Sequence, residues 1–167
     1  MSRHRTPAAP RSPYITASGY RHLQEESRSL WGRRREVTAA LAAAAAEGDR
    51  SENAEYIYRK KELRELDRRI RYLQKRLPQL KVVDSAPAEP DRIFFGASVT
   101  LEDSEGRQLH LRIVGTDEFD PGRQWISVDS PMARALLRRT IDDEVHVQTP
   151  SGERRYLVVD LSYANED

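Results

Sequence analysis

The stretch LRELDRRIRYLQKRLPQL, residues 63–80, decides the fold of the front half of this 167-residue chain. Its aliphatic residues are spaced alternately three and four positions apart: Leu63, Leu66, Ile70, Leu73, Leu77 and Leu80. This spacing is the a/d pattern of a heptad repeat, which places its members on one face of an α-helix. Pro78 should disturb or end the helix near that position, because proline has no N–H to donate. The stretch therefore predicts a helix that packs against another helix through a leucine seam.

A second seam lies upstream of the first. The same spacing joins eight residues, two of which are polar interruptions: Tyr20, Leu23, Ser27, Leu30, Arg34, Val37, Leu41 and Ala44. Thr16 is the expected N-cap of this helix. Because only a short break separates the seams, we expect an antiparallel two-helix coiled-coil hairpin over residues 14–80. Each helix would have roughly 25–30 residues and a length of about 40 Å. A long, thin hairpin buries little apolar surface but can reach into a narrow space.

The break between the seams, EGDRSENAEY at residues 47–56, holds four carboxylates: Glu47, Asp49, Glu52 and Glu55. We call residues 47–55 the acidic tip. One interpretation is a helix capping box with Asp49 as N-cap and Glu52 at N3, with Ser51 as a competing cap. The other is that this pair presents oxygens to a divalent metal such as Mg²⁺, with the remaining ligands supplied by a partner. The two interpretations are compatible, and the motif alone does not choose between them.

Basic residues follow one side of the second helix, away from the leucine seam: Lys60, Arg64, Arg68, Arg71 and Lys75. Between residues 59 and 76, nine basic residues outnumber three acids. A functional interpretation is a stripe that holds a polyanion. The alternative is a solvated face whose cations pair with the interleaved acids Glu62, Glu65 and Asp67. The pattern by itself leaves both interpretations open.

After Lys81 the hydrophobic period changes from that of a helix to that of strands. Strands are expected at residues 94–101, 108–115, 125–130, 144–149 and 154–161. Ser130 as N-cap and Pro131 at the first helical position predict a short helix in SPMARALLR. Residues 81–167 should thus form a small, mostly antiparallel sheet domain with one short helix, reached through the proline-bearing connector at residues 85–91. The chain as a whole is predicted to be of the α+β class.

Composition excludes several kinds of site. The chain has no cysteine, which excludes disulfides and thiolate metal sites, and its four histidines are too scattered for a zinc site. His110 and His146 are expected to be exposed on strands, and no glycine-rich phosphate loop or G-x-S-x-G elbow is present. No apolar run could span a bilayer. Residues 1–13 read as a disordered basic arm without the apolar core of a signal peptide, so we expect a soluble cytoplasmic protein.

Charge is distributed unevenly along the chain. Residues 1–13 carry a net charge of +3, residues 14–80 carry +5, and residues 81–167 carry −7. A basic front half joined to an acidic back half indicates two modules that meet different partners.

Four motifs, GDRSENAEY, RKKELRELDRRIRYLQKRL, FFGASV and SPMARALL, closely resemble those of the bacterial Gre transcript cleavage factors, and in particular the GreB-like branch. The resemblance extends from about Tyr14 to Tyr163. It implies that the hairpin enters the secondary channel of RNA polymerase and that an FKBP-like C-terminal domain docks at the channel rim on the largest subunit. It also implies a catalytic accessory and not an enzyme: the tip would help coordinate a Mg²⁺ shared with the polymerase active site and stimulate cleavage of the extruded RNA 3′ end in backtracked complexes.

The resemblance assigns roles to particular residues. The two essential acids of the family match Asp49 and Glu52. The basic patch that faces the extruded RNA maps to seven residues: Arg59, Lys60, Lys61, Arg64, Arg68, Arg71 and Lys75. Ser130 and Pro131, where the chain enters the short helix, are the candidate polymerase-docking residues. The protein would bind no metal tightly alone, contact no membrane and act as a monomer.

Two other functions fit parts of the sequence. Some relatives occupy the same channel with altered tips and do not stimulate cleavage, but the intact D-x-x-E tip argues against that regulator here. A general nucleic-acid-binding hairpin is the other alternative, and the net charge of −7 on the back half argues against it because it repels nucleic acid.

Overall fold

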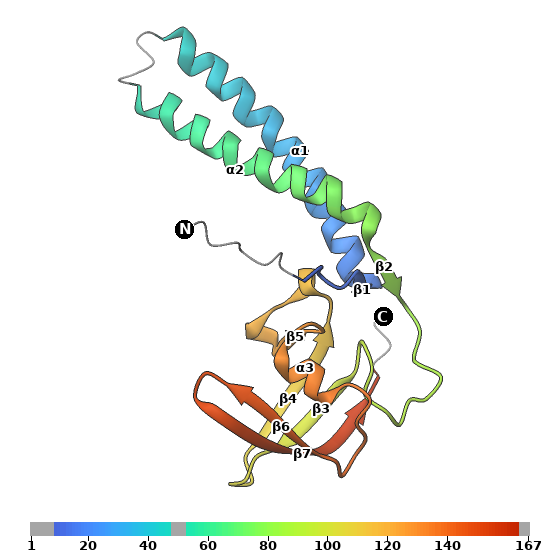
Figure 1. Ribbon diagram of the computed structural model, residues 1–167. Coiled ribbons are helices and arrows are strands. Elements are labelled where there is room, and N and C mark those ends of the chain that lie inside the picture. The colour runs from blue at the N-terminus through green and yellow to red at the C-terminus, as the bar shows by residue number, and fades with distance from the viewer. Residues whose placement is uncertain (1–8, 48–52, 164–167) are drawn as a thin grey trace, which may run out of the picture. The chain divides into compact units, whose positions relative to one another are not determined.

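A computed structural model describes residues 9–47 and 53–163 of the chain. In chain order the elements are β1 (Tyr14–Thr16), α1 (Ala17–Ala46), α2 (Ala54–Arg76), η1 (Leu77–Gln79), β2 (Lys81–Val83), β3 (Ser98–Glu102), β4 (Gln108–Val114), η2 (Thr116–Glu118), η3 (Pro121–Arg123), β5 (Trp125–Ser127), α3 (Pro131–Leu136), β6 (Glu144–Thr149) and β7 (Gly152–Ser162). They form two compact units (Figure 1), a helical hairpin over Tyr20–Leu80 and a sheet unit that contains β1 and the chain from Lys81 onward. The predicted α+β architecture of a hairpin followed by a sheet domain is confirmed.

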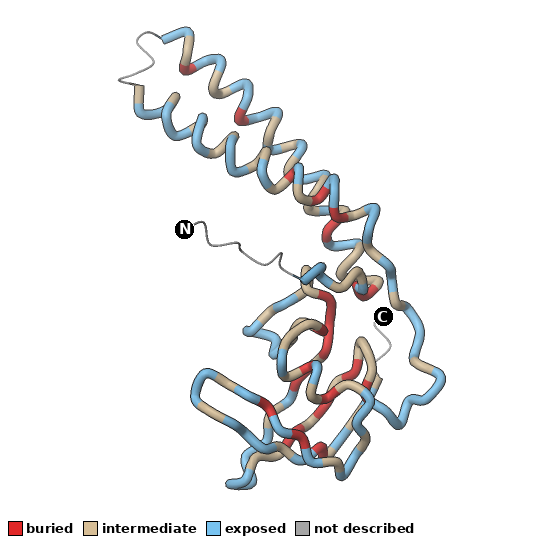
Figure 2. The backbone as a smooth tube through the Cα atoms, in the orientation of Figure 1, coloured by how far each residue is buried: buried red, intermediate tan, exposed pale blue. Residues whose placement is uncertain are grey.

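The hairpin is held together by the two predicted seams. α1 has 30 residues and α2 has 23, and the helices run side by side in opposite directions. Every seam residue is buried or half-buried, and the most deeply buried are Leu23, Val37, Ala44, Ile70 and Leu73. Figure 2 shows separate red, buried segments along the two helices, with tan, half-buried and pale-blue, exposed segments between them. The seam is thus continuous but thin, as the spacing predicts.

The helix ends confirm one predicted cap and correct another. Thr16 Oγ1 accepts the N–H of Gly19 at 3.1 Å, so Thr16 caps α1 as predicted. The N-cap of α2 is Asn53, whose Oδ1 accepts the N–H of Tyr56 at 3.1 Å. The N-cap of α2 is therefore Asn53 and not Asp49 or Ser51, although all three residue types cap helices about equally well. Asp49, Ser51 and Glu52 themselves lie outside the described residues.

α2 ends as the sequence predicts. Its last residue is Arg76, and Pro78 lies in the short 3₁₀ helix η1 that follows. Because proline cannot donate an N–H, it is accommodated in the first turn of the new helix and not within α2.

The sheet unit contains a five-stranded sheet in the order β5-β4-β3-β7-β6. β4 and β5 are parallel and the other neighbouring pairs are antiparallel, which confirms a mostly antiparallel sheet. The first expected strand is shorter than predicted, since β3 begins at Ser98 and not at Phe94. Gly96 has a φ of +87°, a left-handed conformation that turns the chain before β3.

The core of this unit lies between α3 and one face of the sheet. Alternate residues of β3 face it, so Val99 and Leu101 are buried while Thr100 is not. From α3, Ala133 and Leu136 complete the cluster, and both are fully buried. Ser130 Oγ accepts the N–H of Ala133 at 3.2 Å, so Ser130 caps α3 with Pro131 directly after it, as predicted. This small core is what holds the Ser130–Pro131 loop in place.

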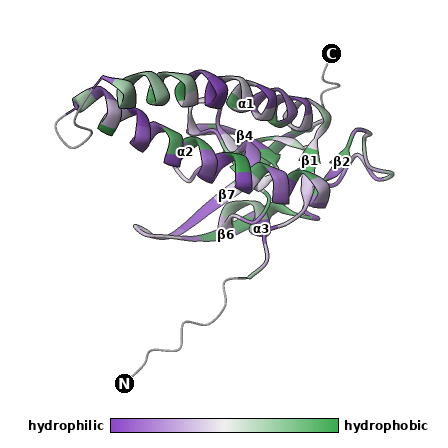
Figure 3. Ribbon diagram, turned by 90° about the horizontal axis from the view of Figure 1, so that it is seen from above, coloured by the Kyte–Doolittle hydropathy of each residue, from purple (hydrophilic) through white to green (hydrophobic). Residues whose placement is uncertain are grey.

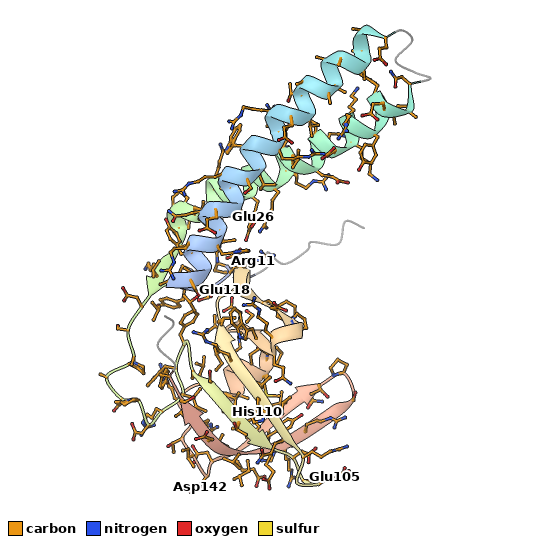
Figure 4. The ribbon with its side chains drawn as sticks, turned by 180° about the vertical axis from the view of Figure 1, so that it is seen from behind. Arg11, Glu26, Glu105, His110, Glu118 and Asp142 are labelled. Carbon is orange, nitrogen blue, oxygen red and sulfur yellow. The ribbon has the colours of Figure 1, made fainter. Side chains whose placement is uncertain are left out.

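β1 and β2 form a separate two-stranded parallel sheet that the sequence did not predict. Ile15 pairs with Val82 and is fully buried. With this pairing, the residues up to Gly19 form one compact unit with the chain from Lys81, and the other compact unit spans Tyr20–Leu80. Glu118, labelled in Figure 4, lies against the start of α1 and accepts the N–H of Thr16.

Candidate functional site

The two acids assigned to the tip, Asp49 and Glu52, lie outside the described residues. The acids on either side of them are described. Glu47 is exposed just after α1, and Glu55 is in the first turn of α2. Glu55 accepts Arg59 Nε at 2.8 Å, so its carboxylate is engaged by its own helix. This separates Glu55 from the pair assigned to metal binding.

Ion pairs across the hairpin engage two of the acids that are interleaved with the predicted basic patch, Glu62 and Asp67. Glu62 accepts Arg33 at 2.7 Å, and Asp67 accepts Arg34 at 2.7 Å. Hydrogen bonding to Arg33, with a further bond from Arg59, holds the pKa of Glu62 below its usual value. Glu62 and Asp67 therefore pair with arginines of α1, and Glu62 also pairs with Arg59 of its own helix at 3.1 Å, as the solvated-face alternative expects.

A third ion pair joins the two helices farther from the tip, toward the start of α1 and the end of α2. Arg69 binds both carboxylate oxygens of Glu26, at 2.7 and 3.0 Å, and Figure 4 labels Glu26 on α1. On α1 the paired residue moves forward from Glu26 to Arg33, whereas on α2 its partner moves back from Arg69 to Glu62. This is the order expected of antiparallel helices. The three ion pairs thus agree with a single antiparallel register of the two helices.

The predicted basic patch divides into two groups in the structure. Arg59 is half-buried and bound by Glu55 and Glu62. The others are exposed on α2: Lys60, Lys61, Arg64, Arg68, Arg71 and Lys75. We call these six residues the basic stripe, and Figure 3 shows the purple, hydrophilic character of this helix.

Within the basic stripe, most cations have no partner in the described part of the chain. Lys60 lies over the Tyr56 ring at 5.9 Å, and Arg71 Nε is 3.4 Å from the carbonyl of Asp67. Among the described residues, four make no hydrogen bond or ion pair: Lys61, Arg64, Arg68 and Lys75. Their charge remains available to an external polyanion.

Two exposed apolar side chains lie at the tip end of the basic stripe. The exposed fractions are 54% for Ile57 and 61% for Tyr58. At about 100° per residue, Ile57 falls on the same side of α2 as Arg64 and Arg68. Neighbouring apolar residues that are exposed beside a charged stripe are typical of a surface that a partner covers.

The sheet unit contains no catalytic arrangement in its described residues. His110 and His146 are exposed, as predicted. His110 Nδ1 lies 2.9 Å from Thr100 Oγ1, and His146 Nδ1 lies 2.7 Å from Glu153, whose pKa it lowers. Across residues 9–47 and 53–163, no three His, Cys, Asp or Glu side chains gather in a way that could hold a metal ion. No helix in these same ranges is long and apolar enough to cross a membrane.

The candidate docking residues are adjacent, as expected from their sequence positions. Ser130 is half-buried because its hydroxyl caps α3, whereas Pro131 is exposed. Of this pair, only Pro131 exposes its side chain to a partner.

Comparison with protein families covers both units. The model of the GreA/GreB transcription elongation factor N-terminal domain matches residues 13–82, and that of the C-terminal domain matches residues 87–163. The chain belongs to the GreA/GreB family. The N-terminal match spans the hairpin, the acidic tip and the basic stripe, so the candidate site lies in the Gre N-terminal domain.

Individual Gre relatives match over almost their full length. The chain is 56% identical to transcription elongation factor GreB of Xanthomonas axonopodis pv. citri, over 99% of each chain. It is 54% identical to that of Pseudomonas aeruginosa, over 98% of each. Among solved structures, GreA factor homolog 1 of Thermus thermophilus is 26% identical with a TM-score of 0.43, over 91% of this chain and 99% of that one.

One residue of the candidate site was missed by the sequence analysis. Asn53 directly precedes α2, and its Nδ2 donates to the carbonyl of Ala44 on α1 at 2.9 Å. The signal that could have found the cap is an N-cap residue type immediately before AEY, but the bond to Ala44 depends on how the hairpin closes.

Proposed function

We propose that this Gre-family protein enters the secondary channel of RNA polymerase and stimulates Mg²⁺-dependent cleavage of the extruded RNA 3′ end in backtracked complexes. It acts in the cytoplasm, as a monomeric catalytic accessory, and the polymerase supplies most of the active site. Cleavage places a new RNA 3′ end in that site and lets transcription restart.

The observation that carries this proposal is the Asn53 cap of α2. Its Oδ1 satisfies the N–H of Tyr56 at the start of the helix. Asp49 and Glu52 precede this cap in the sequence, so a residue other than these acids caps the start of α2. Two acids that do not cap α2, in the segment between the helices of a long hairpin, support a function toward a partner.

A metal fits this tip only if it is shared. Mg²⁺ prefers six oxygen ligands, and two carboxylates are too few to hold it tightly. No cluster of three or more His, Cys, Asp or Glu side chains among the described residues could hold the ion, and in this proposal Asp49 and Glu52 would hold it together with acids of the polymerase. When bound there, the ion supplies charge stabilisation at the scissile phosphodiester and acidifies a bound water.

The basic stripe supports binding of RNA along the hairpin. Because Glu62 and Asp67 pair with arginines of α1, they do not neutralise the cations on the outer side of α2. A single strand that leaves the polymerase active site past the tip would meet Lys61, then Arg64 and Arg68. Phosphate contacts of this kind orient RNA without reading its sequence.

Docking of the protein at the channel rim is assigned to the loop that enters α3. Pro131 is exposed there, and the buried Ala133 and Leu136 anchor the helix that follows the loop in the core of the sheet unit. The likeness of the sheet unit to FKBP-type domains stays a prediction, and shared architecture would not make the unit an isomerase.

The test is a reconstituted backtracked elongation complex with 3′-labelled RNA and Mg²⁺. The double variant Asp49→Ala/Glu52→Ala is compared with the wild type, and binding of both proteins to polymerase is measured in parallel. Glu47→Ala is the matched control, because it removes an exposed acid from the same tip to which no role is assigned.

We expect the wild type and Glu47→Ala to release a short labelled fragment, and the double variant to bind without doing so. Equal cleavage by the double variant would show that the two acids have no part in the reaction. Binding without cleavage by the wild type would identify the protein as a non-cleaving channel regulator.

A further inference from the structure

Asn53 connects the two helices of the hairpin at the tip. Its Oδ1 accepts the N–H of Tyr56 at 3.1 Å, and its Nδ2 donates to the carbonyl oxygen of Ala44 at 2.9 Å. One side chain thus caps the start of α2 and the end of α1 together, at the end of the hairpin where α1 finishes and α2 begins (Figure 1).

The carbonyl of Ala44 needs such a donor. The last four carbonyls of an α-helix have no partner within the helix. Ala44 is only 4% exposed, and the last turn of α1 contains no basic residue that could cover these carbonyls. The N–H of Glu47 also reaches this oxygen, but at the longer distance of 3.3 Å. Asn53 therefore supplies the shorter hydrogen bond to a carbonyl that has little access to water.

The side-chain amide is what makes both bonds possible. An amide has an acceptor oxygen and a donor NH₂ group, which are held apart in a fixed geometry. An Asp at this position keeps the acceptor for Tyr56 but offers no hydrogen to Ala44. A Ser at this position can still accept the N–H of Tyr56, but its side chain is too short to reach the carbonyl of Ala44 on α1. Helix capping alone would accept any of these residues equally well, whereas bridging the two helices requires Asn.

We propose that Asn53 is a positioning residue for the cleavage reaction, because its side chain joins the start of α2 to the end of α1 and so sets the spacing of the two helix ends between which the two assigned acids lie in the sequence. This role rests on the proposed function, which assigns the reaction to Asp49 and Glu52. Without the bond to Ala44, the side chain of Asn53 no longer joins the end of α1 to the start of α2. A displacement of about 1 Å at a reacting group can cost on the order of 100-fold in rate.

The test uses Asn53→Asp and Asn53→Ser in the backtracked complex. Both variants retain the N-cap of α2 and lose the bond to Ala44, and only the first adds a charge. Ala54→Ser is the matched control, since residue 54 is exposed and its side chain takes part in neither bond. Cleavage rate is measured at saturating and at half-saturating protein, and helix content is measured by circular dichroism.

We expect both Asn53 variants to lower the saturated cleavage rate about 10-fold or more, at an unchanged half-saturating concentration and helix content. In NMR spectra of the free wild-type protein, the Asn53 side-chain amide protons should exchange slowly with solvent. Full cleavage by Asn53→Ser, beside an active wild type, would overturn the positioning role and leave the proposed function intact. A wild type that binds polymerase and does not cleave would overturn both.

Discussion

Glu118 accepts the backbone N–H of Thr16 through Oε2 at 3.1 Å, although the two residues are 102 positions apart in the sequence. The same carboxylate accepts the hydroxyl of Thr16 and, at 2.8 Å, the N–H of Gly115. Thr16 is 4% exposed, so water cannot readily replace these bonds. Glu118 therefore attaches Thr16, the N-cap of α1, to the sheet unit.

Gly19→Ala should destabilise the sheet unit. A Cβ added to Gly19 would lie 2.0 Å from Glu118 Oε1, so the carboxylate would have to move away from Thr16. Leaving buried donors unsatisfied typically costs about 1–3 kcal/mol, and we expect a loss in that range in urea denaturation. Unchanged stability would show that the Glu118 contact contributes nothing.

Gly32→Ala is the matched change in the same helix and should have the opposite sign. The nearest atom to an added Cβ at Gly32 is Arg35 Nη2, at 3.9 Å, so nothing has to move. Replacing a glycine in the interior of a helix by alanine stabilises it by roughly 0.5–1 kcal/mol. Thermal unfolding of the hairpin, followed by circular dichroism, should shift upward; a downward shift would contradict the assignment of open space at this position.

Acid should weaken the hairpin through Glu62. Its hydrogen bond to Arg33 lowers the pKa of Glu62 from an ordinary value of 4.5. A carboxylate whose folded-state pKa is lowered contributes stability that is present above 4.5 and is lost as the pH falls through the folded-state value. We expect the midpoint for Glu62 in an NMR titration to lie below 4.5. Arg33→Met should move that midpoint upward, and an unmoved midpoint would show that the ion pair is absent in solution.

Removing two cations of the basic stripe should weaken the interaction with RNA. In Arg64→Ala/Arg68→Ala, the protein concentration for half-maximal cleavage should rise and should depend less on salt. Each lost phosphate contact to a single strand lowers the log–log salt slope by about 0.7, so we expect a decrease of about 1.4. Arg107→Ala is the control, because Arg107 is 67% exposed in the sheet unit and paired with local acids. An unchanged slope would exclude these arginines from the RNA path.

Pro131→Ser should weaken docking on polymerase without changing the fold. Proline at the first position of a helix contributes only its fixed φ, and exposed substitutions usually change stability by less than about 0.5 kcal/mol. Competition with labelled wild-type protein for polymerase measures the loss of affinity, and Glu105→Ser in the exposed turn between β3 and β4 serves as the control. Equal competition by wild type and Pro131→Ser would place the docking surface elsewhere.

Much of the architecture follows from local sequence patterns. The 3-4 spacing around Ile70 and Val37 predicts both helices and the faces they bury, because helical periodicity is set by contiguous residues. The caps at Thr16 and Ser130 and the end of α2 near Pro78 are predicted for the same reason. Alternation along β4 likewise predicts the buried position of Ile113.

Local sequence patterns predict only part of the candidate site. The acids and cations are found from composition and spacing, but which of them remain available is decided by partners on the other helix. Glu62 and Asp67 look like partners of the basic stripe in the sequence, yet in the folded hairpin they face Arg33 and Arg34. The tip motif also contains three residue types that cap helices equally well, and only the folded hairpin shows that Asn53 caps α2 and also bonds to Ala44.

By itself, the sequence determined that this protein has two long helices, a short acidic break and a small sheet domain, since each of these is encoded by neighbouring residues. Only the tertiary structure decided the pairing of β1 with β2, the attachment of Thr16 to Glu118 and the double cap by Asn53. Three-residue strands carry too little periodicity to be recognised. A carboxylate 102 positions away, or a carbonyl on the opposite helix, becomes a partner only when the chain closes and excludes water from both groups.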